Sequence, residues 1–295
     1  MQQQTELEPG MAGDEAPRRL RGQLSRRILG RPLTVAGMVI VLLFLAMALI
    51  GIFVTPQPPD TLNYSAVLAP PSSSYPFGTD DLGRDILSRI IAGAHISLMV
   101  GVVSIGMAMA CGIVLGLLAG YLGSWVDQTI MRLMDIMLAF PDILLAIVII
   151  AILGPGLFNV IIAVGIGAVP VYTRTVRAAV LGVREQEFVE AARALGVAPW
   201  RIMRVHILRN IMAPIIVLAT LGVGLAILIA AGLSFIGLGA QPPTPEWGDM
   251  LNEAQTYLQQ AWWMAVFPGT AITLTVIGLN LLGDGLRELL DPTTG

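Results

Sequence analysis

The sequence predicts an all-α, polytopic membrane protein with six transmembrane helices. The chain of 295 residues is 55% hydrophobic and 13% charged, and its mean hydropathy is +0.77, which is typical of multi-span membrane proteins. A helix needs about 20 mostly apolar residues to cross the hydrocarbon core of a bilayer. Six stretches reach that length: residues 33–54, 97–122, 130–153, 158–180, 211–236 and 263–283.

Arginine sets the predicted orientation. All 17 basic residues are arginine, and loops rich in basic residues stay on the cytoplasmic side of a membrane. Arginines cluster before the first span and between the fourth and fifth, so both chain ends are expected in the cytoplasm. The clustered residues are Arg18, Arg19, Arg21, Arg26, Arg27 and Arg31 in the tail, and Arg184, Arg193, Arg201, Arg204 and Arg209 in the loop.

This orientation divides the chain into a tail, a first span, an outer segment, a core of five spans and a second tail. The predicted boundaries of these segments are 1–32 for the cytoplasmic N-terminal tail, 33–54 for the first span and 55–96 for the extracytoplasmic segment. The core covers 97–283 with a cytoplasmic loop at 181–210, and the cytoplasmic C-terminal tail covers 284–295.

Residue types that the chain lacks exclude two classes of enzyme. It has no lysine, and a Walker A phosphate loop requires one, so ATP hydrolysis through such a site is not expected. Two histidines without an H-E-x-x-H motif do not support a zinc protease. The single Cys111 cannot form a disulfide within the chain. No cofactor or metal is expected in this chain, and energy for any transport must come from elsewhere.

The outer segment 77–91 has the pattern of a helix that lies in the membrane interface. Thr79 can cap its first turn, and the spacing pairs Asp80 with Arg84 and Asp85 with Arg89. Such a helix either anchors in lipid or docks an extracytoplasmic partner, and amphipathicity does not choose between them. The charged candidates are Asp81, Arg84, Asp85 and Arg89, and Leu82, Ile86 and Ile90 form the apolar stripe.

Small residues recur at every fourth position on two of the spans. In lipid such a face lets another helix approach closely, because association rests on van der Waals contact. The two faces are either static packing surfaces or the walls of a sliding seam or pathway. In the third span, Pro141 removes a backbone hydrogen bond and predicts a kink. The small residues are Ser104, Ala108, Gly112, Gly116 and Gly120 in the second span, and Gly222, Ala226, Ala230 and Ser234 in the fifth.

The cytoplasmic loop has the pattern of helix, turn and helix. Gly196 is placed to end a first helix, and Pro199 to begin a second. The first helix would present one apolar face, and the second would project an aromatic anchor into the groove of a partner. The apolar face consists of Phe188, Ala191, Ala192 and Leu195, and the anchor row of Trp200, Met203 and Ile207.

At this loop the chain resembles the permease subunits of ATP-binding-cassette importers. Their cytoplasmic loop carries Glu-Ala-Ala, three residues and Gly, and the chain has Glu190, Ala191, Ala192 and then Gly196. Further blocks resemble the second, C-type permease of the dipeptide/oligopeptide group. These blocks are residues 77–85, 233–243, 245–248, 261–263 and 280–287, and the resemblance runs from about residue 33 to about residue 292.

The resemblance implies a type I importer permease fold in a prokaryotic cytoplasmic membrane. It implies a non-enzymatic subunit that works beside a sister permease, two ATP-binding subunits that bind ATP and Mg²⁺, and an extracytoplasmic substrate-binding protein. No nucleic-acid partner is expected. Peptides are the expected substrates, with glutathione or nickel as alternatives. Glu190 to Gly196 and the helix from Pro199 would then couple the permease to its ATPases. A secondary transporter and a channel remain the alternatives of other classes.

Overall fold

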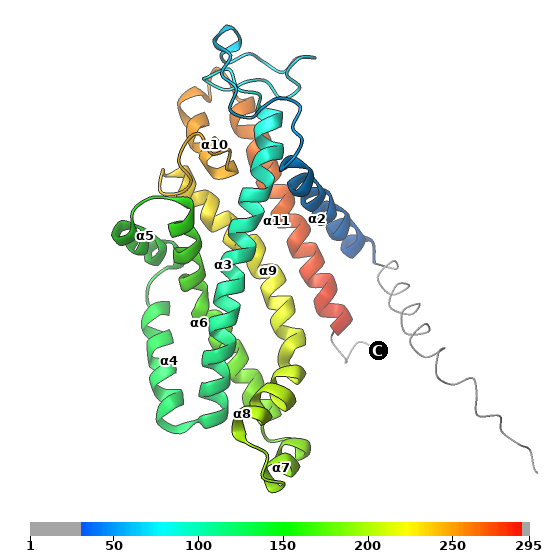
Figure 1. Ribbon diagram of the computed structural model, residues 1–295, viewed down its shortest axis with the longest axis vertical. Coiled ribbons are helices and arrows are strands. Elements are labelled where there is room, and N and C mark those ends of the chain that lie inside the picture. Colours follow the sequence, from blue (N-terminus) through cyan, green and yellow to red (C-terminus); the bar gives the residue numbers. More distant parts are fainter. Residues whose placement is uncertain (1–30, 291–295) are drawn as a thin grey trace, which may run out of the picture.

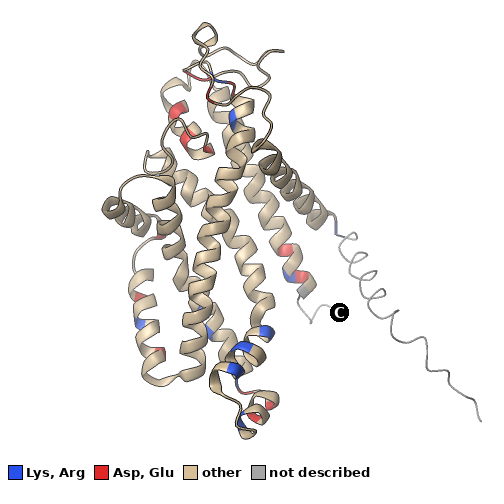
Figure 2. Cartoon of the chain, in the orientation of Figure 1, with Lys and Arg blue, Asp and Glu red and all other residues tan. Residues whose placement is uncertain are grey.

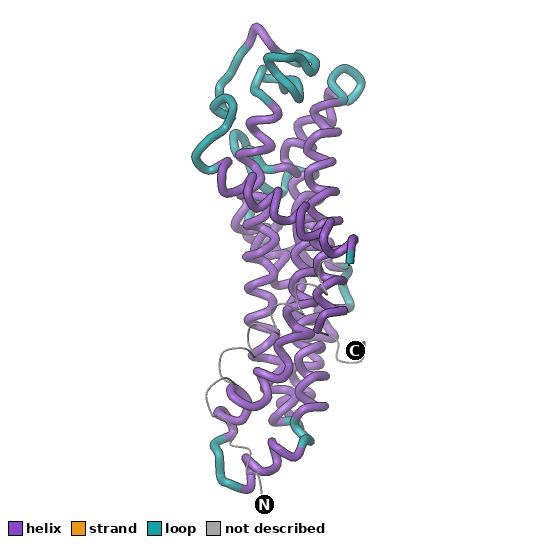
Figure 3. The backbone as a smooth tube through the Cα atoms, turned by 90° about the vertical axis from the view of Figure 1, so that its right-hand side faces the viewer, coloured by secondary structure: helices purple, strands orange, loops and turns teal. Residues whose placement is uncertain are grey.

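The computed structural model describes residues 31–290, and within them the chain is made of helices and loops without a named strand. Figure 1 shows an elongated helical bundle, and Figure 3 shows that most loops gather at its two ends. The main helices are α2 (Pro32–Gly51), α3 (Ile86–Leu122), α4 (Ser124–Leu138), α5 (Asp142–Leu153), α6 (Leu157–Val183), α7 (Glu187–Ala194), α8 (Pro199–Arg201), α9 (Leu208–Phe235), α10 (Trp247–Ala254) and α11 (Trp263–Leu290).

The long helix α3 runs through the centre of the bundle. It packs along α6 and α9 on one side, while α2 packs against α11 and α3 on the other. Within residues 31–290, five helices are long and apolar enough to span a membrane, or six if α4 and α5 together form one bent span. The predicted number of spans therefore holds only if α4 and α5 count as one crossing.

The third span is broken rather than kinked. α4 and α5 meet at an angle of 91°, and Figure 1 shows α5 leaving the bundle at about mid-height. Pro141 stands directly before α5, where its ring prevents the helix of α4 from continuing. The sequence therefore located the break but underestimated the bend.

The outer helix predicted for residues 77–91 does not form. Residues 79–85 are a loop, and the helix begins at Ile86, where the Asp85 carboxylate accepts a hydrogen bond from the Ser88 N–H. Thr79 is buried and caps no helix. Residues 86–91 are thus the first turns of α3 rather than part of an interfacial helix, because a better cap lies six residues further along the chain.

Two other predicted boundaries also move. A π-helical segment, Ile202–Ile207, joins α8 to α9, so a continuous helical run extends from Pro199 to Phe235. At the other end α11 continues to Leu290, so residues 284–290 are helical rather than a tail. The N-terminal tail up to residue 30, with five of its arginines, and residues 291–295 lie outside the described residues.

Candidate functional site

The loop between α6 and α9 forms one tip of the molecule. Figure 2 shows both acidic and basic residues gathered there, next to long helices that carry few charges. Gly196 ends α7 with a φ of +72°, and the Val197 N–H donates to the Ala192 carbonyl in the pattern of a Schellman cap. Pro199 is the first residue of α8. The predicted turn chemistry is confirmed at both positions.

The apolar face that anchors this tip differs from the predicted one. Val189 and Ala192 of α7 are buried against Ile202, Ile207 and neighbouring residues of α6 and α9. Leu195 is 83% exposed, and Phe188 and Ala191 are exposed as well. Of the predicted apolar face only Ala192 is buried, because the π-helical segment beneath α7 sets which side of this short helix turns inward.

The predicted anchor row is also divided by the structure. Ile207 is fully buried in the bundle, Met203 is half-buried, and Trp200 is 61% exposed. Ile207 therefore holds the loop to its own chain and cannot enter a partner's groove. Trp200 remains the one member of the row that presents most of its side chain to the outside.

Glu190 lies exposed beside a polar hollow at the same tip. The hollow is lined by Glu190, Arg184, Arg193, Tyr121 and Glu185. Arg184 donates to the Gly120 carbonyl at 2.8 Å, and the Arg193 guanidinium stands 5.2 Å from the Tyr121 ring centroid. These contacts tie the loop to the end of α3, so a force applied at the tip can reach the long helices.

The small-residue face of α3 lies against α6. Ser104, Ala108, Gly112, Gly116 and Gly120 are all buried. A Cβ placed on Gly112, Gly116 or Gly120 would lie 2.4, 2.6 or 2.7 Å from a Cβ atom of α6. Backbones this close leave no space for side chains, so this face is a packing surface in the conformation seen here.

The small residues of α9 border the same core from the other side. Ala226 and Ala230 are buried in the cluster formed by α3, α5 and α6. A Cβ on Gly222 would lie 2.3 Å from the Tyr172 hydroxyl. Gly112, Gly116 and Gly120 of α3 and Gly222 of α9 therefore all pack against α6 rather than against one another.

A buried charge cluster occupies the opposite end of the molecule. Arg84 Nε lies 2.5 Å from Asp80 Oδ2, and Arg84 Nη2 lies 2.9 Å from Glu253 of α10. Arg89 is fully buried, and its Nη2 stands 3.5 Å from the same Glu253 carboxylate. The predicted Asp80–Arg84 pair forms, whereas Asp85 caps α3 and Arg89 turns to α10.

The cluster holds the outer loops against α3. Glu246 caps α10 by accepting from the Gly248 and Asp249 N–H groups, and the Ser97 hydroxyl of α3 donates to it. The Trp247 indole donates to the Ile90 carbonyl at 3.1 Å. A Cβ on Gly93 would lie 2.0 Å from the Pro245 carbonyl oxygen. Glycine is therefore required there for α10 to approach α3.

Burial raises the pKa values of two acids in this cluster. Desolvation, followed by the neighbouring Glu253 and Glu246 carboxylates, raises the pKa of Asp249 to about 7. Burial also raises the pKa of Glu246. Oxygens of Asp80, Asp81 and Glu253 lie within 4.8 Å of one another, the spacing of a cation site. The Arg84 guanidinium forms ion pairs with all three of these carboxylates, so arginine already balances part of their charge.

The sequence analysis missed Glu246, Asp249 and Glu253. A signal for their helix was present, since Trp247, Met250, Leu251 and Ala254 follow the i, i+3, i+4, i+7 spacing of an amphipathic helix. That pattern predicts α10 but not its contact with residues 80–89, which are far away in the sequence.

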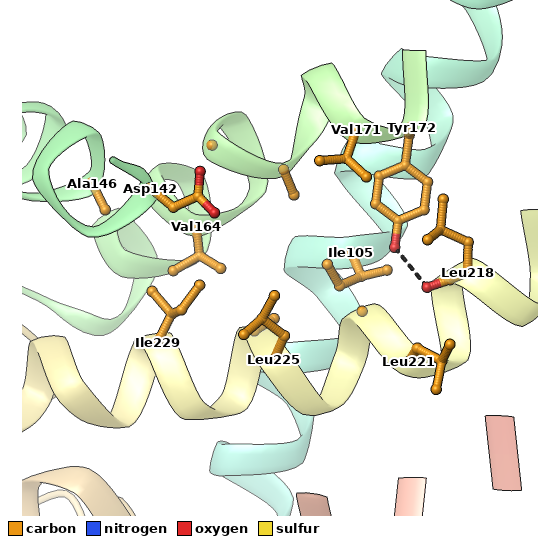
Figure 4. A pocket seen from close by; sticks show the side chains of 14 residues that line it. Ile105, Asp142, Ala146, Val164, Val171, Tyr172, Leu218, Leu221, Leu225 and Ile229 are labelled. Atoms are coloured by element: carbon orange, nitrogen blue, oxygen red, sulfur yellow. Dashed lines mark hydrogen bonds between the residues drawn. The ribbon is translucent and has the colours of Figure 1, made fainter. Parts of the chain in front are cut away.

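An apolar cavity of about 200 Å³ lies between α3, α5, α6 and α9. Its walls come from the middle of α6 and the middle of α9, as Figure 4 shows. Asp142 stands at one end, and at the other the Tyr172 hydroxyl donates to the Leu218 carbonyl at 3.3 Å. This cavity brings together residues that no sequence motif had connected.

Comparison with protein families gives two matches. Residues 112–295 match the family described as binding-protein-dependent transport system inner membrane component. Residues 21–71 match the N-terminal transmembrane domain of oligopeptide transport permease C.

Three relatives cover most of the chain. The dipeptide transport system permease protein DppC of Alkalihalophilus pseudofirmus is 51% identical over 88% of this chain and 86% of its own length. The probable D,D-dipeptide permease DdpC of Escherichia coli K12 is 45% identical over 90% and 89%. The glutathione permease GsiD of Pectobacterium atrosepticum is 46% identical over 90% and 89%.

A solved structure shares the fold. The chain matches the MetNI methionine ABC transporter in an inward-facing conformation with a TM-score of 0.55 and 20% identity, over 68% of this chain and 95% of that one. The likeness covers nearly the whole of that chain, so the bundle has the same architecture.

Proposed function

We propose that this chain forms half of a peptide translocation pathway driven by ATP. The premise is that the chain belongs to the binding-protein-dependent inner-membrane permease components of ABC importers. The family makes it a multi-pass inner-membrane permease subunit of the dipeptide/oligopeptide type. Two ATP-binding subunits, a sister permease and an extracytoplasmic binding protein complete the proposed complex. ATP and Mg²⁺ are bound by the partner subunits, and both chain ends lie in the cytoplasm.

The observation that carries this proposal is the tip formed by α7 and α8. It is polar, it projects from an apolar bundle, and Trp200 is largely exposed there while Val189 and Ile207 fix it to the bundle. A rigid contact of this kind can bias the permease between inward-open and outward-open states when the ATPases close. Buried aromatic residues often supply about 2 kcal/mol or more of an interface's binding energy.

Copurification of the ATPases tests the coupling role. Trp200→Ala should lower the amount of ATPase recovered with the permease, because it removes the exposed anchor. Glu190→Lys should lower substrate-stimulated ATP hydrolysis and uptake together. Trp262→Ala is the matched control, since Trp262 is 54% exposed near the opposite end of the molecule. Full recovery and full uptake in both tip variants would refute the coupling assignment.

Uptake into reconstituted vesicles tests the transport class and the substrate. Peptide uptake that requires ATP and the ATPases supports an importer, whereas uptake driven by an ion gradient alone would indicate a secondary transporter. Glutathione is the second candidate, because the GsiD relatives are nearly as similar as the dipeptide permeases. Competition between labelled dipeptide and glutathione separates these substrates.

A further inference from the structure

Asp142, the first residue of α5, is an acid that the fold does not use. Among residues 31–290 its carboxylate has no hydrogen-bond or ion-pair partner. Two acids of the preceding helix α4 are both paired, Asp127 with Arg177 and Asp135 with Arg174. An acid in the first turn of a helix is favoured by the helix dipole. The helix dipole alone would explain an acid at this position. It does not explain why this acid stands at the end of an apolar cavity.

The position of Asp142 indicates which face of the bundle borders the pathway. The cavity opens between residues 164–172 of α6 and 218–229 of α9, in the middle of both helices. Asp142 itself is exposed in the structure, and a carboxylate beside the middle of two membrane helices is costly against acyl chains, so its open side faces a partner subunit or a water-filled path. On the other side, α2 exposes Leu42, Leu43 and Leu49 and carries no acid, as a lipid-facing surface does.

The residues that line the cavity indicate what kind of ligand it can bind. Its lining is apolar apart from the Asp142 carboxylate and the Tyr172 hydroxyl, and no basic side chain lines it. A ligand that complements it has one positive charge next to an apolar group. With about 200 Å³, the cavity is below the roughly 300–1,000 Å³ of sites that enclose a whole drug-sized ligand. It therefore suits one end of a larger substrate.

We propose that Asp142 binds the α-ammonium group of the transported peptide during passage, with the first side chain of the peptide in the cavity between α6 and α9. The proposal rests on the proposed transport function and adds a binding subsite to it. Glutathione also carries an α-ammonium group, but a carboxylate stands on the same carbon and no apolar side chain does, so it fits the contact with Asp142 and not the apolar cavity. A bare metal ion does not fit, since one carboxylate beside apolar walls offers too few oxygen ligands.

The test measures uptake by the complete transporter, with its binding protein, in proteoliposomes. Asp142→Asn should lower the maximal uptake rate of a free-amino dipeptide about tenfold, equivalent to about 1.4 kcal/mol. The rate for the N-acetylated dipeptide, which lacks the positive charge, should not change. Asp142→Glu keeps the charge and should retain most of the difference between the two peptides. Asp135→Asn removes a carboxylate of α4 outside the cavity and should leave both rates as in the wild type.

Comparing two peptides on one variant separates binding from structure, because a structural defect lowers both rates by the same factor. An equal loss for both peptides, or no loss for either, would overturn the role of Asp142. Absence of peptide uptake by the wild-type complex would instead overturn the proposed function. If Asp142→Asn does not assemble, Asp142→Cys can be labelled after assembly in a Cys111→Ala background. An anionic label should then restore the preference for the free-amino peptide, and a cationic label restoring it equally would overturn the proposal.

Discussion

Adding one methyl group at Gly116 should separate α3 from α6. A Cβ there would lie 2.6 Å from Val176 Cβ and 2.7 Å from the Thr173 carbonyl oxygen, whereas carbon atoms in contact stand about 3.5–4.0 Å apart. The helices must therefore move apart by roughly 1 Å. Overpacking of this kind typically costs about 1–3 kcal/mol.

Gly106 of the same helix provides the matched control. A Cβ on Gly106 meets nothing within 4 Å. Replacing a helical glycine by alanine stabilises the helix by about 0.5–1 kcal/mol at either position. The difference between Gly116→Ala and Gly106→Ala therefore isolates the cost of overpacking, because the gain in helix propensity cancels.

Thermal unfolding of the purified transporter measures this difference. For a chain of this size about 1 kcal/mol shifts the midpoint by roughly 2–4 °C, so Gly116→Ala should unfold several degrees below Gly106→Ala. Uptake should fall in parallel if the two helices must stay packed during transport. Equal midpoints for the two variants would refute the close α3–α6 packing at Gly116.

The remaining predictions concern the outer charge cluster and the cytoplasmic tip. The folded pKa of Asp249 is raised to about 7 from 3.8, so the folded state binds more protons between these values. Stability should therefore fall as pH rises from about 4 to about 7 and then level off. Asp249→Asn should flatten part of this dependence in unfolding midpoints measured across that range, and an unchanged slope would contradict the assignment. Glu253→Gln removes the carboxylate that the buried Arg84 and Arg89 share and should destabilise the protein by about 3–5 kcal/mol, measured by chemical unfolding. A loss below about 1 kcal/mol would show that the remaining carboxylates, Asp60, Asp80 and Asp81, can neutralise the arginines. Ile207→Ala opens a cavity beneath the tip and should cost about 2–5 kcal/mol, whereas Trp200→Ala should change the midpoint little and lower ATPase recovery and the uptake that depends on it.

The sequence located most of the membrane helices because their signals are local. The lengths of the apolar runs and the positions of Pro141, Gly196 and Pro199 follow from transfer energies and backbone conformation, which depend on neighbouring residues alone. The family resemblance likewise rests on short blocks such as Glu190 to Gly196. The sequence also indicated the break at Pro141, although not its angle.

The errors arose where a contact between distant segments outweighed a local pattern. The outer segment has the charge spacing of a helix, yet Arg84 and Arg89 form ion pairs with Glu253, more than 160 residues away. Two buried arginines need carboxylates around them, and a loop at residues 79–85 allows this better than a regular helix does. On α7 the buried face is Val189 and Ala192 because the π-helical segment beneath it fixes its rotation.

By itself, the sequence determined that this protein crosses a membrane several times, which face of α3 carries only small residues, and to which family the chain belongs. Only the tertiary structure decided that this face meets α6, that α10 completes a buried charge cluster, and that Asp142 stands at the end of an apolar cavity. The physical reason is the range of the interactions. Helix propensity and transfer into lipid act on consecutive residues, whereas ion pairs, close helix packing and cavities depend on side chains that folding brings together.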